Sequence, residues 1–169
     1  KRFKIILSKN SNHFCIRCGI FQFMFVDNWN AITWSVVDYF RRPKKGYTVL
    51  KTVYQPVLIG MDLDREKVSL DMLRATGFPG TWVVNDTLNL YKNLCAKIIL
   101  LRGREILGEK EIGIGDIPAN DVKRISYPPI LEESMKLNIE ERGTYIIEME
   151  LRDIKDKLIS KNSYKIEVV

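Results

Sequence analysis

The sequence has only three cysteines and one histidine, and no run of 18 or more apolar residues. Without such a run the chain has no transmembrane helix, and with so few cysteines it is not a disulfide-stabilised scaffold. At 46% hydrophobic and 28% charged residues it is globular rather than disordered. No signal peptide is present, so we expect a cytoplasmic protein; the start at Lys1 instead of Met is expected of a fragment or a processed product.

The scarcity of cysteine and histidine also limits metal binding. His13, Cys15 and Cys18 form a His-x-Cys-x-x-Cys sequence, and Cys95 is the one remaining thiol. A tetrahedral zinc site needs four ligands, and a single CxxC is equally typical of two reduced thiols at the entry to a buried strand. We therefore expect no metal and no cofactor.

Acidic residues are scarce at the start of the chain. Residues 1–51 hold ten lysines and arginines against two acidic residues, a net charge of +8, whereas residues 52–169 carry −2. Eleven of the seventeen aromatic residues precede residue 55. This asymmetry predicts two parts of different kind, residues 1–54 and residues 55–169.

A basic and aromatic first part is compatible with nucleic-acid binding. However, no zinc finger, helix-turn-helix or aromatic ribonucleoprotein motif accompanies the charges. Arg41, Arg42, Lys44 and Lys45 are more simply interpreted as a solvated turn before a helix. We expect neither a nucleic-acid partner nor a membrane partner.

Residues 1–54 contain the pattern of one β/α unit. Residues 19–26, GIFQFMFV, are nearly all apolar, which predicts a strand buried on both faces. After a long loop, Pro43 fits the first position of a helix. That helix must end before Pro56, because the residue preceding a proline is disfavoured in helical conformation.

From residue 56 onward the hydrophobic period changes to two. Apolar and polar residues alternate in TYIIEMELR (144–152) and SYKIEVV (163–169), and GTWVVND (80–86) and AKIILLR (96–102) are further strands. Turn signals fall at 102–104, 113–118 and 153–157. The sequence therefore predicts a mainly β protein: an immunoglobulin-like antiparallel β-sandwich with Trp82 in its core, preceded by the β/α unit.

Asp27-Asn28-Trp29, the segment WSVVDY at 34–39 and Gln55-Pro56-Val57 occur in this order. This order resembles the end of the catalytic barrel in glycoside hydrolase family 2, especially in its β-mannosidase-like branch. There the eighth barrel strand leads into an Asp-x-Trp-Pro loop, a Trp-Ser-x-x-Asp-Tyr segment, the eighth helix and a C-terminal immunoglobulin-like domain. The resemblance implies that residues 1–54 end a (β/α)8 barrel and that residues 55–169 are the sandwich.

The resemblance also implies where sugar would be contacted. Residues 27–34 would be the loop after strand eight, at the barrel face that carries active sites. Phe23, Asp27, Asn28 and Trp29 would contact substrate, because aromatic rings cover the C–H face of a sugar and polar groups bind its hydroxyls. Phe23 stands where these enzymes usually carry a Trp. Trp29 either covers the sugar or plugs the barrel rim, and Trp34 is expected to pack near the helix.

Catalytic carboxylates are missing from this arrangement. Retaining glycosidases use two carboxyl groups about 5–5.5 Å apart, and the resemblance places both upstream of Lys1. Asp27 and Asp38 are the only acidic residues before residue 62, and nothing in the sequence indicates that they converge. We expect no catalytic residue here. The expected function is that of a C-terminal portion of a β-mannosidase-like O-glycosyl hydrolase, which acts on carbohydrate together with the rest of the barrel and is inert alone.

Two other classes remain open. One is a free-standing carbohydrate-binding or protein-interaction sandwich, which would need an aromatic platform, and Trp82 is the only Trp beyond residue 34. The other is a metal-binding or nucleic-acid-binding module built on residues 1–51. A β/α segment cut from a barrel also exposes apolar flanks. Residues 1–54 are therefore expected to pack on the sandwich or to pair two copies as a homo-oligomer.

Overall fold

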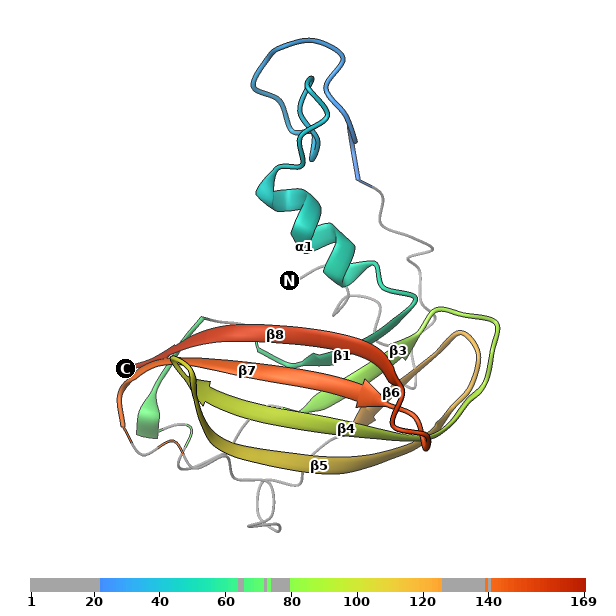
Figure 1. The fold of residues 1–169 in the computed structure, drawn as a ribbon, viewed down its shortest axis with the longest axis vertical. Helices are drawn as coiled ribbons and strands as arrows, with labels where there is room; N and C mark the ends of the chain where they lie inside the picture. Colours follow the sequence, from blue (N-terminus) through green and yellow to red (C-terminus); the bar gives the residue numbers. More distant parts are fainter. Residues whose placement is uncertain (1–21, 64–65, 72, 74–79, 126–138, 140) are drawn as a thin grey trace. The chain divides into compact units, whose positions relative to one another are not determined.

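The computed structural model describes residues 22–63, 66–71, 73, 80–125, 139 and 141–169 (Figure 1). The chain divides into two compact units, Lys1–Gln55 and Pro56–Val169. One helix lies in the first unit and eight strands lie in the second, so the described chain is mainly β. Within these ranges no helix is both long and apolar enough to cross a membrane.

The first unit contains the helix α1, Lys45–Val53. Lys44 occupies the N-cap position with an extended backbone, so α1 begins two residues after Pro43 and not with Pro43 in its first turn, as the sequence had predicted. The backbone N–H of Tyr54 donates to the last turn at 2.8 Å and closes the helix. The helix stops there because the ring of Pro56 disfavours helical backbone in the residue before it.

The strand predicted at 19–26 is not formed over its described part, residues 22–26. Val26 alone makes a β-bridge, to Val37, and Met24 has a φ of 56° that interrupts an extended conformation. Phe23 and Phe25 are exposed. A barrel strand is held by neighbouring strands on both edges, and the described residues of this unit supply a single bridge to residues 22–26.

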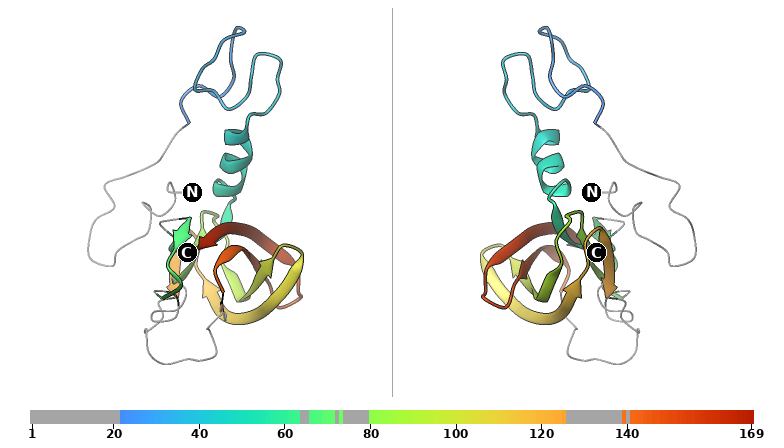
Figure 2. Two further views of the ribbon diagram at one scale, coloured as in Figure 1. Left: turned by 90° about the vertical axis from the view of Figure 1, so that its left-hand side faces the viewer. Right: turned by 90° about the vertical axis from the view of Figure 1, so that its right-hand side faces the viewer.

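The second unit is an immunoglobulin-like β-sandwich, and its two sheets form two layers (Figures 1 and 2). One sheet has the strand order β2-β8-β7-β4-β5 and the other has the order β1-β3-β6. Neighbouring strands are antiparallel, except for the short parallel pair of β2 and β8. The strands are β1 Val57–Met61, β2 Lys67–Val68, β3 Thr81–Asn85, β4 Tyr91–Arg102, β5 Glu105–Ile117, β6 Asp121–Ile125, β7 Gly143–Arg152 and β8 Leu158–Val168.

The four segments predicted as strands correspond to β3, β4, β7 and β8. The turns predicted at 102–104 and 153–157 join β4 to β5 and β7 to β8. The turn predicted at 113–118 is wrong, since most of that segment belongs to β5. Gly113 and Gly115 lie there at a register irregularity opposite β4. Gly115 has a φ of 73°, so these glycines form a β-bulge and not a chain reversal.

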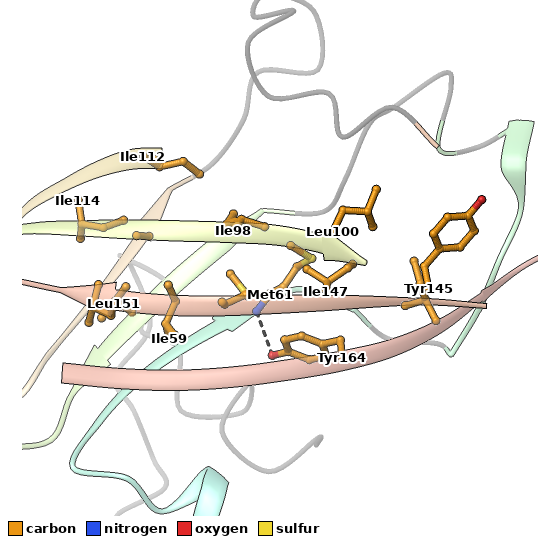
Figure 3. Close-up of a cluster of buried hydrophobic side chains, with 14 of the residues drawn as sticks. Ile59, Met61, Ile98, Leu100, Ile112, Ile114, Tyr145, Ile147, Leu151 and Tyr164 are labelled. Atoms are coloured by element: carbon orange, nitrogen blue, oxygen red, sulfur yellow. Dashed lines mark hydrogen bonds between the residues drawn. The ribbon is translucent and has the colours of Figure 1, made fainter. Parts of the chain in front are cut away.

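The core lies between the two sheets and follows the period-two pattern. In β4 and β7 every second side chain is buried, whereas the side chains between them are half-buried or exposed. The inward residues of the five-stranded sheet meet those of β1 and β3 (Figure 3). Representative members of this cluster are Ile59, Met61, Val83, Ile98, Leu100, Ile147, Met149 and Leu151.

Side chains of β8 bond the open edge of β1. Ser160 Oγ accepts the N–H of Ile59 at 3.3 Å, and Asn162 Nδ2 donates to the carbonyl of Ile59 at 3.0 Å. The hydroxyl of Tyr164 accepts the N–H of Met61 at 3.1 Å (Figure 3). Because β1 pairs with β3 on one side only, these bonds satisfy backbone groups that would otherwise be unpaired. Burial raises the pKa of Tyr164 and keeps it neutral.

Trp82 is buried, as predicted, with 8% of its surface exposed. Its neighbour Val83 belongs to the main core, so by strand alternation Trp82 faces the other side of the three-stranded sheet. Its cross-strand partner is Gly60. A Cβ atom at that position would lie 2.3 Å from the indole ring, so only glycine leaves room for the tryptophan. The indole Nε1 is buried without a hydrogen-bond partner among the described residues.

Candidate functional site

The loop between Asp27 and Ser35 is the candidate site, and backbone hydrogen bonds close its two ends. The carbonyl of Phe25 accepts the N–H groups of Val36 and Val37 at 3.2 and 3.0 Å, and the N–H of Asp27 donates to the carbonyl of Val37 at 3.0 Å. The chain therefore leaves this closure at residue 28 and returns to it at residue 35.

The side chain of Asp27 lies inside this closure. Its surface is 1% exposed, and both of its carboxylate oxygens are bonded within the loop. Oδ1 accepts the hydroxyl of Thr33, and Oδ2 accepts the ammonium of Lys44 at 2.9 Å. The same ammonium donates to Ser35 Oγ at 2.9 Å. One buried carboxylate thus connects the start of the loop, its end and the N-cap of α1.

These bonds lower the pKa of Asp27 to about 2. The hydroxyl of Thr33 has the largest effect, followed by the ammonium of Lys44 and the hydroxyl of Ser35, whereas burial opposes the shift. Donors that bond the ionised form stabilise it relative to the neutral acid. Asp27 is therefore a fixed anion at neutral pH and has no proton to donate.

The aromatic residues of this loop point into solvent. The exposed fractions are 68% for Phe23, 65% for Trp29 and 79% for Trp34. The rings of Phe23 and Trp34 contact each other, with centroids 6.3 Å apart and planes inclined at 50°. The expectation that Trp34 would be packed is therefore wrong for the described chain. Its neighbour Ser35 takes the buried position instead.

Of the residues predicted to contact sugar, Phe23, Asn28 and Trp29 are exposed and Asp27 is not. Flat rings and an amide exposed on a loop can cover and bond a polyol face. The contacts of these four residues with a sugar stay predictions. The geometry does separate the three exposed side chains from the buried anion beneath them.

Asp38, the other acidic residue of this unit, has a separate cation. Its Oδ2 accepts Arg42 Nε at 2.8 Å and its Oδ1 accepts the backbone N–H of Arg42 at 2.8 Å. Partial burial raises the pKa of Asp38, but these hydrogen bonds outweigh that effect and lower it. Asp27 and Asp38 are thus each held by a different partner, which is the arrangement of two structural ion pairs.

Sequence reasoning missed the role of Lys44, which it had grouped with a solvated basic turn. The side chain is 33% exposed and its ammonium is bonded inside the loop. The available signal was that only two acidic residues, Asp27 and Asp38, stand in a strongly basic segment, since a buried carboxylate requires a cation. Nothing in the sequence indicated which of the neighbouring cations would reach it.

Metal binding has no further support in the described residues, among which no group of three or more His, Cys, Asp or Glu side chains converges. His13, Cys15 and Cys18 lie outside the described residues. Cys95 is a free, half-buried thiol of β4. The expectation that the chain binds no metal therefore stays a prediction.

No family model matches the sequence, and no curated protein matches it. Solved structures do match. The exo-chitosanase CsxA of Amycolatopsis orientalis superimposes with a TM-score of 0.63 at 17% identity, over 85% of this chain and 15% of that chain. The β-D-mannosidase of Dictyoglomus thermophilum superimposes with a TM-score of 0.53 at 20% identity, again over 85% of this chain and 15% of that chain.

These likenesses concern the fold. They confirm the resemblance to such hydrolases at the level of backbone architecture. The chain spans only about 15% of the proteins it matches. Those proteins are carbohydrate-active enzymes by their names, and most of each enzyme has no counterpart here.

Proposed function

We propose that this chain is the C-terminal portion of a β-mannosidase-like O-glycosyl hydrolase of glycoside hydrolase family 2. In this proposal residues 1–54 complete a catalytic barrel and contribute one wall of its active site. Residues 55–169 form an accessory β-sandwich. In this proposal residues 1–61 supply no catalytic carboxylate, because their two acidic residues are Asp27 and Asp38 and both are held in ion pairs.

One observation carries the proposal. Most of this chain superimposes on a small fraction of an exo-chitosanase and of a β-mannosidase. The motif order from Asp27-Asn28-Trp29 through WSVVDY to Gln55-Pro56-Val57 resembles the end of the catalytic barrel in glycoside hydrolase family 2. The first likeness is one of the backbone and the second is one of the side chains.

The exposed apolar surface of the first unit supports the proposal that further protein or a ligand covers it. Six large apolar side chains between residues 23 and 40 are each more than half exposed. Soluble proteins rarely leave so many large apolar groups uncovered on one short segment, unless a partner or ligand covers them. In the proposal, the rest of the barrel covers part of this surface and a sugar covers the remainder. The six are Phe23, Phe25, Trp29, Ile32, Trp34 and Phe40.

A free-standing carbohydrate-binding sandwich is the alternative, and the second unit supports it less. Trp82 is buried, so it offers no platform for a sugar ring. The large hydrophobic side chains exposed on the described part of that unit are all aliphatic: Leu88, Leu90, Ile106, Leu107, Ile154, Leu158 and Val169. Sugar stacking needs a flat ring, and the first unit is where the exposed rings lie.

The test uses the complete reading frame, including whatever coding sequence precedes Lys1. We expect the purified product to hydrolyse an aryl β-mannoside or an aryl β-glucosaminide, the two substrate types that the neighbours' names indicate. Trp29→Ala in that enzyme should lower kcat/KM and leave the melting temperature nearly unchanged, because a lost sugar contact acts on binding and on the transition state. Early melting with normal kinetics per folded molecule would instead make Trp29 a rim plug.

The 169-residue chain alone should hydrolyse neither substrate above background. Glycoside hydrolysis needs an acid and a second carboxylate facing one bond, and Asp27 is buried while Asp38 is paired to Arg42. The assay follows release of the aryl leaving group at high protein concentration. Turnover that survives repurification and disappears in Asp27→Asn would contradict the proposal.

A further inference from the structure

The loop that presents Trp29 is anchored at three places by one ammonium group. Lys44 Nζ lies 2.9 Å from Asp27 Oδ2, 2.9 Å from Ser35 Oγ and 3.5 Å from the carbonyl of Thr33. A lysine ammonium has three donor hydrogens, and here three acceptors surround it. All three acceptors belong to the two ends of the loop, at residue 27 and at residues 33 and 35.

The carboxylate of Asp27 is the anionic partner of the Lys44 ammonium. With 1% of its surface exposed, its carboxylate lies too deep to bond a ligand in solvent. Its oxygens instead receive Thr33 and Lys44. The hydroxyl of Thr33 also accepts the backbone N–H of Ser35 at 3.1 Å, and Ser35 Oγ donates to the carbonyl of Val37 at 2.9 Å. The polar groups at the base of the loop therefore bond one another in a connected network.

A buried carboxylate is costly unless a cation compensates it, and removal of one partner of such a pair is more damaging than removal of both. The pair spans 17 positions of the sequence, so it constrains the path of the chain between them. Between the anchors, residues 28–32 are exposed. The network thus holds a rigid base under a loop whose side chains face solvent.

We propose that Lys44 and Asp27 are positioning residues: their buried ion pair fixes the loop 28–34 and so orients the exposed ring of Trp29 toward the sugar. This inference rests on the function proposed above. It gives Asp27 a role different from direct sugar contact, and it gives a role to Lys44, which the motif comparison did not include. Misplacement of a substrate-positioning group by about 1 Å can reduce a rate by roughly a hundredfold.

The first experiment needs only the 169-residue chain. Backbone amide exchange is measured in Lys44→Met at Asp27, Ser35, Val36 and Val37, whose N–H groups are hydrogen-bonded at the base of the loop. Lys45→Met is the matched control, because Lys45 is the next residue and is exposed. We expect exchange at the base of the loop to accelerate at least about tenfold in Lys44→Met, with no change in Lys45→Met, since only the first removes the charge partner of a buried carboxylate. Unchanged loop exchange in Lys44→Met overturns the inference.

Lys44→Met leaves an anion buried, so the double variant Asp27→Asn/Lys44→Met serves as a second test. Removing both charges should restore folding if the single variant unfolds, and its loop should still exchange faster than that of the unmodified chain. Lys44→Arg retains the positive charge and should restore most of the protection. A double variant as protected as the unmodified chain also overturns the inference.

The second experiment uses the complete enzyme and separates this inference from the proposed function. We expect Lys44→Met to lower kcat/KM for the aryl glycoside by about tenfold or more, Lys44→Arg to recover most of it and Lys45→Met to leave it unchanged. A loosened loop with unchanged kcat/KM overturns the positioning role while the proposed function stands. If the unmodified enzyme hydrolyses no glycoside, the proposed function fails, and amide exchange still decides whether the pair fixes the loop.

Discussion

At the scale of single residues, the three tryptophans differ in the exposed fraction of their side chains. Trp29 and Trp34 are 65% and 79% exposed on the loop of the first unit, whereas Trp82 is 8% exposed against Gly60. The same side chain therefore serves two purposes in one sequence. On the loop it offers a flat surface, and in the sandwich it fills the space above a glycine.

Trp82→Ala and Trp34→Ala should accordingly differ in effect. Loss of the buried ring should lower the free energy of unfolding by about 3–5 kcal/mol, and loss of the exposed ring should change it by no more than about 0.5 kcal/mol. Denaturant unfolding followed by circular dichroism measures both. Acrylamide quenching of fluorescence provides the control, because Trp34→Ala should remove a quenchable component and Trp82→Ala should not. Equal destabilisation would mean that Trp34 is buried in solution.

The ionisation of Asp27 gives the loop a pH dependence. Its pKa falls from 3.8 to about 2 on folding, so its ion pair stabilises the loop fully above pH 3.8 and is lost as the pH falls toward 2. The indole N–H resonances of Trp29 and Trp34 should shift over that window. Asp27→Asn should abolish this component and leave the contribution of Asp38, whose pKa is also lowered. The same titration in both proteins would exclude Asp27 as its source.

At the scale of elements, the sandwich depends on how β1 is joined to β8. β1 pairs with β3 on one edge, and its other edge is bonded by side chains of Ser160, Asn162 and Tyr164. A backbone group that is buried without a partner costs about as much as a lost hydrogen bond. These three polar side chains therefore supply the hydrogen bonds that a neighbouring strand would otherwise supply to the backbone of β1.

Tyr164→Phe should lower the free energy of unfolding by about 1–3 kcal/mol, because the buried N–H of Met61 loses its acceptor. Tyr145→Phe is the matched control: it removes a hydroxyl that donates to the carbonyl of Glu141 in a partly buried position. We expect a smaller loss there, about 0.5–1.5 kcal/mol. Thermal or denaturant melts distinguish the two variants. An equal or larger loss in Tyr145→Phe would contradict this account of the β1 edge.

At the scale of the whole molecule, the described parts of the two units differ in how many hydrophobic side chains they bury. Every member of the main hydrophobic cluster lies in the second unit, between Val57 and Val168. The described part of the first unit buries only Val36, Val37 and Val53 among its hydrophobic side chains. A segment with so few buried hydrophobic side chains gains little stability from its own burial.

Residues 56–169 expressed alone should therefore fold, with a β-type far-ultraviolet spectrum and a cooperative melt. Deletion of residues 1–55 also removes the exposed aromatic surface, so the solubility of the shortened protein should exceed that of the full chain at equal concentration. Circular dichroism and a sedimentation assay check both outcomes against the full chain. Loss of cooperative melting in the shortened protein would mean that the first unit is an integral part of the sandwich.

Much of the second unit was determined by the sequence. Alternation in 144–152 and 163–169 specified β7 and β8, because a period of two allows only one face of each strand to be buried. Net charge and aromatic content also change near residue 55. The glycines of 113–118 were misjudged as a turn, because a glycine that relaxes a bulge and one that reverses the chain have the same local preference.

The tertiary structure decided the matters that depend on distant partners. The strand pattern at 19–26 specifies burial, but burial needs neighbouring strands, and the described residues 22–26 have one bridge. The sequence shows that Asp27 is acidic; only the fold brings Lys44, 17 residues away, to its carboxylate. Local preference acts through the backbone of neighbouring residues, whereas the ion pair and the exposure of Trp34 depend on which surfaces the chain brings together.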